Sequence, residues 1–464
     1  MNKRIRLNGV DMNCVGCCPG LWLHPQDETI RYNTLEYWIE LAKLLERGLF
    51  DSLFIADVFG IYDVYGGNAD AAFRNAVEFP VNDPFLVVPA MAAATRHLGF
   101  GLTGTATYEQ PFSFARRVST LDHLTRGRLA WNIVTGYLDS AAKAFGLTEQ
   151  LPHDERYVKT EEFMEVVYKL WEGSWEEGSV LRDKQKRIFA DPEKTHKVRH
   201  EGKYFRMEAY HLCEPSPQRT PILFQAGASS KGREFAAKHA ECVFISAAHP
   251  KAAAEIVGDI RERAASRGRD PQSVQIYVGL PIVCAETDAA AQAKIEDYRR
   301  YVSAEGTLAL WSGYLGVDLA SCNLDEPLSS LQINGIQSFV EGFMRSDPTR
   351  HWTLRDAVDR LGVEGHKARL TGSPATVADA LVGWMEESGV DGFNVSYIVN
   401  PGDLTAFVDL VVPELQRRGV YKTHYDEGTL REKLYGSGRR HLPSTHPGAS
   451  YRFPRAQAAQ SKGA

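Results

Sequence analysis

The chain repeats one pattern along most of its length: a short apolar run, then a stretch whose apolar residues recur at helical spacing. Runs such as 52–58 are apolar at successive positions, which indicates a strand covered on both faces, as in a parallel sheet. Eight strand–helix alternations favour an α/β fold of the (β/α)8 or TIM-barrel type over a doubly wound sheet. The expected strands are 5–12, 52–58, 98–108, 128–136, 220–227, 242–247, 274–283 and 389–398.

Two long segments exceed what a barrel of about 250 residues needs. Residues 136–219 separate the fourth and fifth expected strands, and residues 285–388 separate the seventh and eighth. Both segments carry helical patterns, so we expect large folded insertions rather than structureless loops. We expect one barrel domain over 1–425, followed by a C-terminal extension over 426–464. The end of that extension is rich in Pro, Ser and Gly, which predicts an extended, partly disordered arm.

The ends of two helices can be predicted from local signals. Asn33 can cap a helix, and Glu36 follows it at the spacing of a capping box. Apolar residues then recur at helical spacing until Gly48, where we expect the helix to end. A helix is also expected over 404–417, after the last strand.

Composition excludes several function classes. The net charge of −6 makes a polyanion such as nucleic acid a poor partner. No apolar run approaches the roughly 20 residues that a membrane helix needs. The first residues lack the apolar core of a secretory leader, and seven cysteines, an odd number, argue against a disulfide scaffold. We therefore expect a cytoplasmic protein.

In a barrel of this type, the active site forms where the strands end at their carboxyl side. The side chains expected there are rich in hydroxyls and amides and poor in charge. Such a set suits a polar ring system and a phosphate better than hydrolytic acid–base chemistry, although each Thr or Asn alone could simply cap a helix. The set comprises Met12, Asn13, Cys14, Asp57, Tyr62, Thr103, Thr105, Thr107, Asn132, Thr135, Gln225, Gly227, Ser229, Ser230, Asn394, Ser396 and Tyr397.

The string "FQAGASSKGREF" is the sharpest local signal for a ligand. A strand runs into Gly227, and Ser229 and Ser230 follow at the start of a helix. Free backbone N–H groups and the helix dipole favour an anion there, so we expect a phosphate. The alternative is that Ser229 serves only as a helix cap. "HDERY", with His153 and Tyr157, could reach the same phosphate from the first insertion, or could simply begin a charged helix.

Cys14, Cys17 and Cys18 lie within five residues in "DMNCVGCCPGLWLHP" and raise the question of a metal site. A structural zinc site commonly uses four ligands in two separated pairs, but the next cysteine is Cys213 and the only nearby histidine is His24. We expect no metal here. The chain also lacks the G-x-S-x-G elbow of hydrolases, and no dinucleotide G-x-G-x-x-G follows its first strand.

Long strings of the sequence resemble one enzyme group, the bacterial luciferase-like flavin monooxygenases. The match runs from about Arg4 to Arg452 and is specific for the branch of nitrilotriacetate, dibenzothiophene-sulfone, dimethyl-sulfide and long-chain alkane monooxygenases. The strings are "FIADVFGIYDVYGG", "PVNDP", "ARRVSTLDHLTRGRLAWNIVTGYLDSAAKAFG", "HDERY", "LCEPSPQRTPILFQAGASSKGREFAAKHAECVF", "DGFN", "VPELQRRG" and "GTLREKLYG".

The resemblance implies a two-component TIM-barrel enzyme. It would take reduced FMN from a separate NAD(P)H:flavin reductase and use O2 through a flavin C4a-peroxide to oxygenate its substrate. The terminal arm makes a homo-dimer or homo-tetramer plausible. The expected direct participants in the chemistry are Cys14, Asn132 and His153. The positions implied for FMN contact are Asp57, Thr103 or Thr105, Asn132, His153, Tyr157, Gly227, Ser229 and Ser230.

Substrate is implied less sharply. The alkane enzymes have histidine at the places of Cys17 and Tyr137, and another near Leu310, so these departures favour a dialkyl sulfide or other small organosulfur compound. The alternatives are an alkane or aminopolycarboxylate monooxygenase, a riboflavin-cleaving lyase, a deazaflavin-dependent dehydrogenase, or a module that only binds flavin. The expected substrate pocket consists of Cys14, Cys17, Tyr62, Tyr137 and Trp311.

Overall fold

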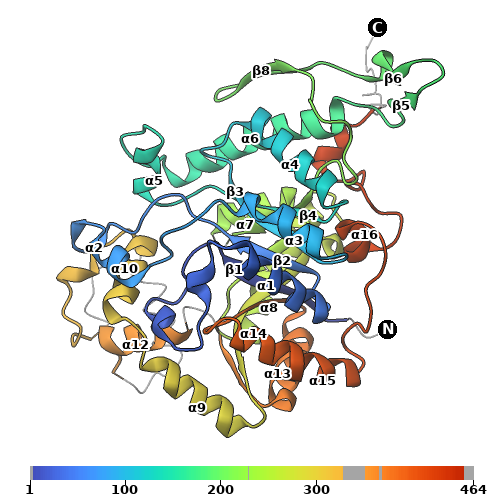
Figure 1. Ribbon diagram of the computed structural model, residues 1–464. Helices are drawn as coiled ribbons and strands as arrows, with labels where there is room; N and C mark the ends of the chain where they lie inside the picture. Colours follow the sequence, from blue (N-terminus) through green and yellow to red (C-terminus); the bar gives the residue numbers. More distant parts are fainter. Residues whose placement is uncertain (1–3, 228, 328–350, 365–367, 454–464) are drawn as a thin grey trace.

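A computed structural model describes residues 4–227, 229–327, 351–364 and 368–453. Eight parallel strands close into a barrel, in the order β1, β2, β3, β4, β9, β10, β11 and β13, with β13 pairing back onto β1 (Figure 1). The predicted TIM barrel is therefore confirmed. The strands span Arg6–Met12, Ser52–Ala56, Gly99–Thr105, Leu129–Val134, Ile222–Ala226, Cys242–Ile245, Gln275–Cys284 and Gly392–Ser396.

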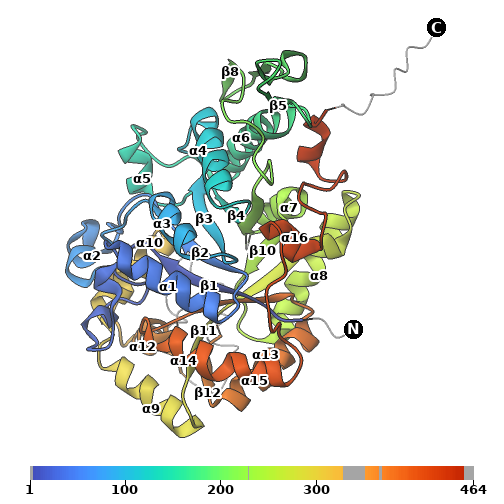
Figure 2. The same cartoon turned by 45° about the vertical axis from the view of Figure 1, so that its right-hand side comes forward.

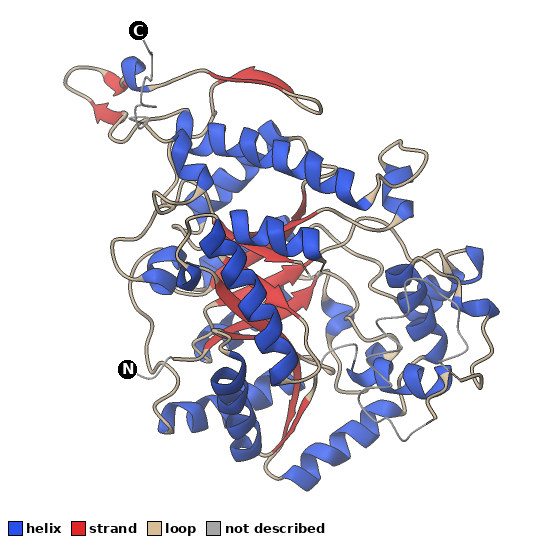
Figure 3. Ribbon diagram, turned by 180° about the vertical axis from the view of Figure 1, so that it is seen from behind, coloured by secondary structure: helices blue, strands red, loops and turns tan. Residues whose placement is uncertain are grey.

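Helices surround this barrel as a continuous layer in which each packs against the next. Figure 3 shows the strands enclosed by them. No described helix is both long and apolar enough to cross a membrane. The layer consists of α1 (Leu35–Arg47), α3 (Val88–Ala94), α4 (Pro111–Leu124), α6 (His153–Gly173), α7 (Ser230–His239), α8 (Pro250–Ser266), α13 (Pro374–Ser388), α14 (Gly402–Ala406) and α15 (Val412–Arg417).

One prediction about a helix end is wrong, and one predicted helix contains an irregular segment. The cap of α1 is Thr34, whose hydroxyl accepts a hydrogen bond from the backbone of Tyr37, so the helix begins one residue later than expected and Glu36 is too early for a capping box. The helix predicted over 404–417 is helical throughout this range, but a wider π-helical segment, Phe407–Val411, separates α14 from α15. Pro413 explains the interruption, since it lacks an N–H and its ring clashes with the preceding turn of a regular helix.

The segment 136–219 contains both barrel and accessory elements. Its α6 lies in the helix layer between α4 and α7. The short helix α5 (Asp139–Ala144) precedes α6, and two hairpins follow it and project away from the barrel (Figure 1). The hairpins are formed by β5 (Val180–Asp183) with β6 (Ile188–Ala190), and by β7 (Val198–Glu201) with β8 (Arg206–Ala209).

Most described elements of the segment 285–388 form a lobe beside the carboxyl ends of the strands, whereas α13 belongs to the helix layer. Its α10 packs against α2, which lies in the long connection after β2, and against α12. The short β12 extends the sheet by pairing with the end of β11. The elements of this lobe are α2 (Asp70–Asn75), α9 (Asp288–Arg299), α10 (Ala304–Leu315), α12 (Leu354–Glu364) and β12 (Leu370–Gly372).

The C-terminal extension closes the opposite end of the barrel with α16 (Leu430–Tyr435), which lies beside β10 (Figure 2). Leu430 and Leu434 pack against phenylalanines of the barrel interior. The guanidinium of Arg431 is buried, with 2.7 Å between its Nε and Oε1 of Glu241. A final 3-10 turn, Pro447–Tyr451, packs against α6. The predicted disorder at the end of the arm concerns 454–464, which lie outside the described residues.

Candidate active site

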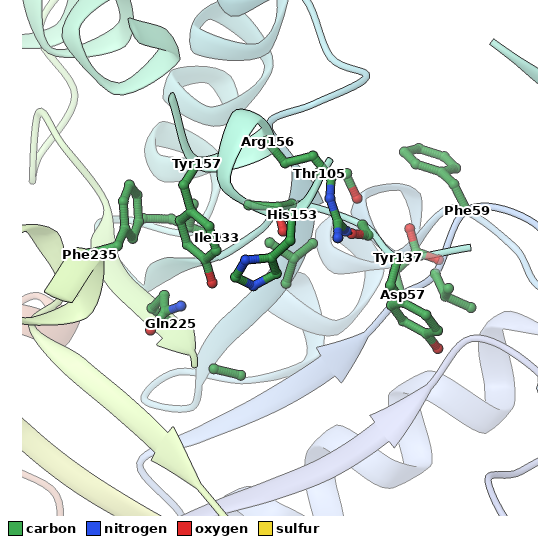
Figure 4. A pocket seen from close by; sticks show the side chains of 15 residues that line it. Asp57, Phe59, Thr105, Ile133, Tyr137, His153, Arg156, Tyr157, Gln225 and Phe235 are labelled. Atoms are coloured by element: carbon green, nitrogen blue, oxygen red, sulfur yellow. The ribbon is translucent and has the colours of Figure 1, made fainter. Parts of the chain in front are cut away.

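A cavity of about 330 Å³ opens at the carboxyl ends of β2, β3, β4 and β9 and is bounded by α6 and α7. Figure 4 shows His153, Tyr157, Gln225 and Phe235 toward one end, and Asp57, Phe59 and Tyr137 toward the other. The structure thus brings four predicted cofactor residues and one predicted substrate residue around one space. Those five are Asp57, Thr105, His153, Tyr157 and Tyr137.

The N-terminus of α7, with Gly227 and Ser229 before it, lies at the edge of this cavity and forms a tightly packed corner that can bind an anion. Gly227 directly follows β9, and a Cβ atom added to it would lie 2.6 Å from Nε2 of Gln225 and 2.9 Å from the backbone carbon of Gly232. Ser229 caps α7, and its hydroxyl accepts from the N–H of Gly232 at 3.0 Å. Ser229 thus does cap the helix, as the alternative interpretation predicted. This cap occupies only one N–H group, so other N–H groups of the first turn remain available for an anion.

Two side chains of α6 approach that corner. Nε2 of His153 lies 3.4 Å from the hydroxyl of Ser229, while its Nδ1 lies 2.8 Å from the carboxylate of Asp154. The buried ring of Tyr157 packs edge-on against the His153 ring, with centroids 5.2 Å apart. Burial raises the pKa of Tyr157, so its hydroxyl stays a donor at neutral pH. Ser230 differs, because it is exposed and its hydroxyl accepts from Arg263 of α8 at 3.4 Å.

Buried amide oxygens lie in the barrel strands next to this cavity. Asn132 donates to the hydroxyl of Thr103 at 3.0 Å, yet its own Oδ1 has no hydrogen-bond partner among the described residues. The same holds for Oε1 of Gln225, which lines the cavity, and for Nε of Arg156. A buried polar atom left unpaired costs about 1–3 kcal/mol. These atoms therefore fit a ligand that carries both donors and acceptors.

A second cavity of about 450 Å³ adjoins the first and shares Asp57, Val58 and Phe59 with it. Thr103 lines the second cavity, whereas Thr105 lines the first. Most of the second lining is apolar. Its remaining lining residues are Gly60, Ile61, Phe79, Val81, Asn82, Asp83, Phe85, Gly104, Glu109, Arg117, Ser140 and Ala144.

Asp57 is the charged group at the boundary between the two cavities. Burial raises its pKa to about 7, and the neighbouring carboxylate of Asp83 acts in the same direction. The backbone N–H of Val58 opposes both effects by donating to the carboxylate. Asp57 is therefore close to half protonated at neutral pH, and it can donate or accept a hydrogen bond there.

The cysteines near the start of the chain separate in the structure. Cys14 is buried in an apolar cluster with Tyr62 and Leu310, and Cys17 packs against that cluster. Cys18 instead packs against a different cluster around Leu21. None of the three thiols forms a disulfide with a described residue, and the described residues contain no group of His, Cys, Asp and Glu suited to a metal. Burial raises the pKa of Cys14 well above its usual value, so it remains a neutral thiol.

The remaining predicted pocket residues do not all meet. Tyr62 and Tyr137 share a hydrogen bond of 2.6 Å between their hydroxyls. Trp311 packs on another face of α10, against Leu319 and Trp352, and lines neither cavity. Of the three residues expected to take part directly in the chemistry, Cys14, Asn132 and His153, the first cavity is lined only by His153.

Sequence reasoning missed two residues that join this region. Tyr314 of α10 and Glu78, from the connection after α2, both meet Tyr62. Tyr314 could have been found, because it lies four residues after Leu310 and therefore on the same helical face. Glu78 has no comparable signal, since it lies in an irregular loop with a left-handed φ of 46°.

Comparisons with known proteins agree with one another. The family model described as "Luciferase-like monooxygenase" matches residues 17–392. The chain is 49% identical to the dimethyl-sulfide monooxygenase of Hyphomicrobium sulfonivorans, over 97% of this chain and 94% of that protein. It is 47% identical to the long-chain alkane monooxygenase of Geobacillus thermodenitrificans, over 97% of this chain and 99% of that protein.

Solved structures give the same result. The crystal structure of DmoA from Hyphomicrobium sulfonivorans superposes with a TM-score of 0.93 at 48% identity, covering 98% of this chain and 97% of that one. A riboflavin lyase, crystallised with modified FMN and riboflavin, superposes with a TM-score of 0.89 at 37% identity, covering 97% of this chain and 100% of that one. The same barrel therefore serves both an oxygenase and a lyase among its relatives.

Proposed function

The chain belongs to the luciferase-like monooxygenase family, and we propose that it oxygenates a small organosulfur compound, with a dialkyl sulfide as the expected substrate. In this proposal a separate NAD(P)H:flavin reductase supplies reduced FMN, and O2 is the co-substrate. The main observation in support is the cavity between the N-terminus of α7, which can bind an anion, and the unpaired buried amide oxygens of Asn132 and Gln225.

The residues present fit FMN. The start of α7 at Gly227 and Ser229, with Tyr157 and His153 beside it, would hold the phosphate. The amides of Asn132 and Gln225 and the hydroxyl of Thr105 would face the ribityl chain and the ring. When bound, the reduced flavin supplies the electrons that activate oxygen.

The protein itself would orient the flavin and the substrate, exclude water from the cavity and supply protons. Val58, Phe59 and Ile133 form an apolar part of the cavity wall, which excludes water from the reacting region. Asp57 can hold or release a proton at neutral pH because of its raised pKa of about 7. Cys14 adds a neutral, weakly polar surface to the adjoining cluster.

Charge around the second cavity argues against anionic substrates. Its lining contains the carboxyl groups of Asp57, Asp83 and Glu109, and its one cationic residue is Arg117. The guanidinium of Arg117 already lies 2.7 Å from Glu109. An aminopolycarboxylate would therefore enter this cavity against like charge, and the described lining of the cavity offers it no spare cation. A neutral substrate fits better.

The tyrosine hydroxyls beside the first cavity favour a substrate with a heteroatom over a plain alkane. Tyr137 lines that cavity and its hydroxyl lies 2.6 Å from that of Tyr62. An alkane packed there would cover polar atoms without giving a hydrogen bond in return, which is unfavourable. A sulfide offers a weak acceptor to the same surface.

The test combines the purified protein, a generic flavin reductase, NADH, FMN and isotopically labelled oxygen with a substrate panel. The panel contains dimethyl sulfide, longer dialkyl sulfides, hexadecane, nitrilotriacetate and riboflavin. We expect label to enter a product of the sulfides, and Asn132→Leu to weaken FMN binding. Faster conversion of hexadecane or nitrilotriacetate would refute the substrate. Cleavage of riboflavin without any small-molecule oxygenation would refute the monooxygenase assignment in favour of a lyase.

A further inference from the structure

The second cavity lies between the protein surface and the first cavity, the proposed flavin site. Its lining includes the exposed residues Asn82, Asp83 and Ala144 at the outer end. At the inner end it includes the buried Thr103, and it shares Asp57 with the first cavity. A small molecule that enters this space from the surface therefore reaches the edge of the flavin site.

The wall of the second cavity is mostly apolar, and most of it comes from the long connection after β2. An alkyl group packed against such a wall leaves water, which is favourable by up to about fourfold in affinity for each methylene. Ligand sites of this kind combine an apolar lining with a few polar groups. The apolar side chains include Phe59, Ile61, Phe79, Val81, Phe85 and Ala144.

The charged groups of this wall are engaged with one another or with the backbone. The guanidinium of Arg117 lies 2.7 Å from Glu109 and 5.3 Å from the centre of the Phe85 ring. The carboxylate of Asp83 accepts from the N–H of Phe85 at 2.8 Å and caps the 3-10 turn that Phe85 belongs to. An uncharged apolar group can therefore occupy the cavity without breaking an ion pair or a cap.

Hydrogen bonds between two connections fix the shape of the second cavity. The hydroxyl of Ser140, on α5, accepts from the N–H of Ile61 at 3.0 Å and donates to the carbonyl of Ile61 at 2.7 Å. Gly60 has a φ of 103°, and a Cβ atom on it would lie 2.6 Å from this hydroxyl. Glycine therefore lets the two connections approach, and contacts within the protein hold the wall in place.

Phe59 lies at the boundary between the two cavities. It lines both of them, and Figure 4 shows it near Asp57 at one end of the first cavity. Two aromatic rings from other connections support it, since its ring centre lies 5.2 Å from that of Phe145 and 6.3 Å from that of Tyr108. The rings of Tyr108 and Phe145 stack with their centres 4.6 Å apart. Phe59 is therefore held by packing, and loss of its ring would widen the opening between the cavities.

We propose that the second cavity binds an alkyl group of the substrate, and that Phe59, at the boundary with the first cavity, selects substrates by size. This inference rests on the proposed function, because it assumes a substrate that carries an alkyl group to the flavin. The alkyl group lies in the second cavity, and the sulfur lies at the boundary beside Asp57. No bond forms or breaks in the second cavity, which contributes binding alone.

A series of dialkyl sulfides measures this contribution in the wild type, with reductase and saturating FMN. We expect kcat/KM to rise by up to about fourfold for each added methylene until the cavity is filled. The informative quantity is the ratio of kcat/KM for dibutyl sulfide to that for dimethyl sulfide. Effects on the flavin and on oxygen are common to both substrates, so they cancel in this ratio.

Ala144→Trp tests the subsite, because it places a large ring at the exposed outer end of the second cavity. We expect the ratio to fall at least about tenfold, since the lost space is that of about two methylenes. Ala289→Trp is the matched control, because it makes the same change at an exposed position of α9 that lines neither cavity. The subsite is refuted if Ala144→Trp keeps the ratio, or if Ala289→Trp lowers it as much.

Phe59→Ala tests the selection by size and should act in the opposite direction. Removal of the ring gives a longer chain more room, so the ratio of kcat/KM for dihexyl sulfide to that for dibutyl sulfide should rise at least about tenfold. The measurement is made at saturating FMN, so that weaker flavin binding does not affect the ratio. An unchanged or lower ratio refutes the role given to Phe59.

Xenon binding to crystals of the flavin-free protein separates this inference from the proposed function. Xenon enters apolar cavities. We expect it in the second cavity of the wild type and of Ala289→Trp, and we expect its loss in Ala144→Trp. An empty second cavity in the wild type would refute the apolar subsite whatever the reaction is. If xenon binds there but no sulfide of the panel is oxygenated, the proposed function fails while the apolar cavity stands.

Discussion

Replacing Asp57 by Asn should stabilise the protein at high pH, and the structure gives the size of the effect. Burial raises the pKa of Asp57 from 3.8 to about 7 in the folded state. Between these values the folded protein holds a proton that the unfolded chain has released, so the stability contributed by Asp57 falls as pH rises. A shift of about three units corresponds to roughly 4 kcal/mol at pH values above the folded pKa.

The assay is urea unfolding of the wild type and of Asp57→Asn at pH 5 and pH 8. Asn mimics the protonated carboxyl and removes its pH dependence. The variant should therefore gain stability over the wild type, and this gain should grow by about 2–3 kcal/mol from pH 5 to pH 8. Asp139→Asn is the control, since Lys143 lowers the pKa of exposed Asp139 and the corresponding change should be small and of opposite sign.

A gain for Asp57→Asn that is the same at both pH values would refute this reasoning. It would mean that Asp57 is ionised in the folded state throughout this range, and that water or a neighbouring donor offsets its burial. The role given to Asp57 as a proton-holding group beside the flavin would then fail as well.

Two further substitutions test the proposed phosphate site at the start of α7 and the C-terminal extension that closes the opposite end of the barrel. Gly227→Ala should weaken FMN binding at least about tenfold, because a Cβ there meets Gln225 and overpacking typically costs about 1–3 kcal/mol. Gly258→Ala, which meets no atom within 4 Å, is its control in an FMN titration. Arg431→Met should lower the free energy of unfolding by about 3–5 kcal/mol, since it leaves the buried carboxylate of Glu241 without its cation. A loss below about 1 kcal/mol in a urea titration would contradict that account of the C-terminal extension.

Local patterns predicted the barrel strands well and the helix details less well. Seven of the eight barrel strands lie within their predicted ranges and β11 ends one residue later, because buried parallel strands are continuous apolar runs that need no partner to be recognised. The cap of α1 moved from Asn33 to Thr34, since both residue types can cap and only the backbone conformation decides. The break before α15 followed from Pro413, a signal that was present in the sequence but outweighed by helical spacing.

The candidate site shows the same division. The start of α7 could be predicted, since strand, glycine and capping serine are neighbours in sequence. Thr103 and Thr105 could not be told apart, because residues two apart in a strand share a face and only their depth in the barrel assigns them to different cavities. Trp311 was predicted to line the pocket, but Tyr314 is the residue of α10 that contacts Tyr62. The sequence could not show this, because the rotation of α10 about its axis is set by its packing against α2 and α12.

The sequence by itself determined the barrel, the family and the helix start suited to a phosphate, because each depends on short-range periodicity or on neighbouring residues. Only the tertiary structure decided which side chains enclose the cavity and which meet the side chain of Tyr62. Glu78, Tyr137 and Tyr314 lie in three connections far apart in the sequence. They meet because barrel closure brings the carboxyl ends of all strands to one side, a long-range consequence that no local pattern encodes.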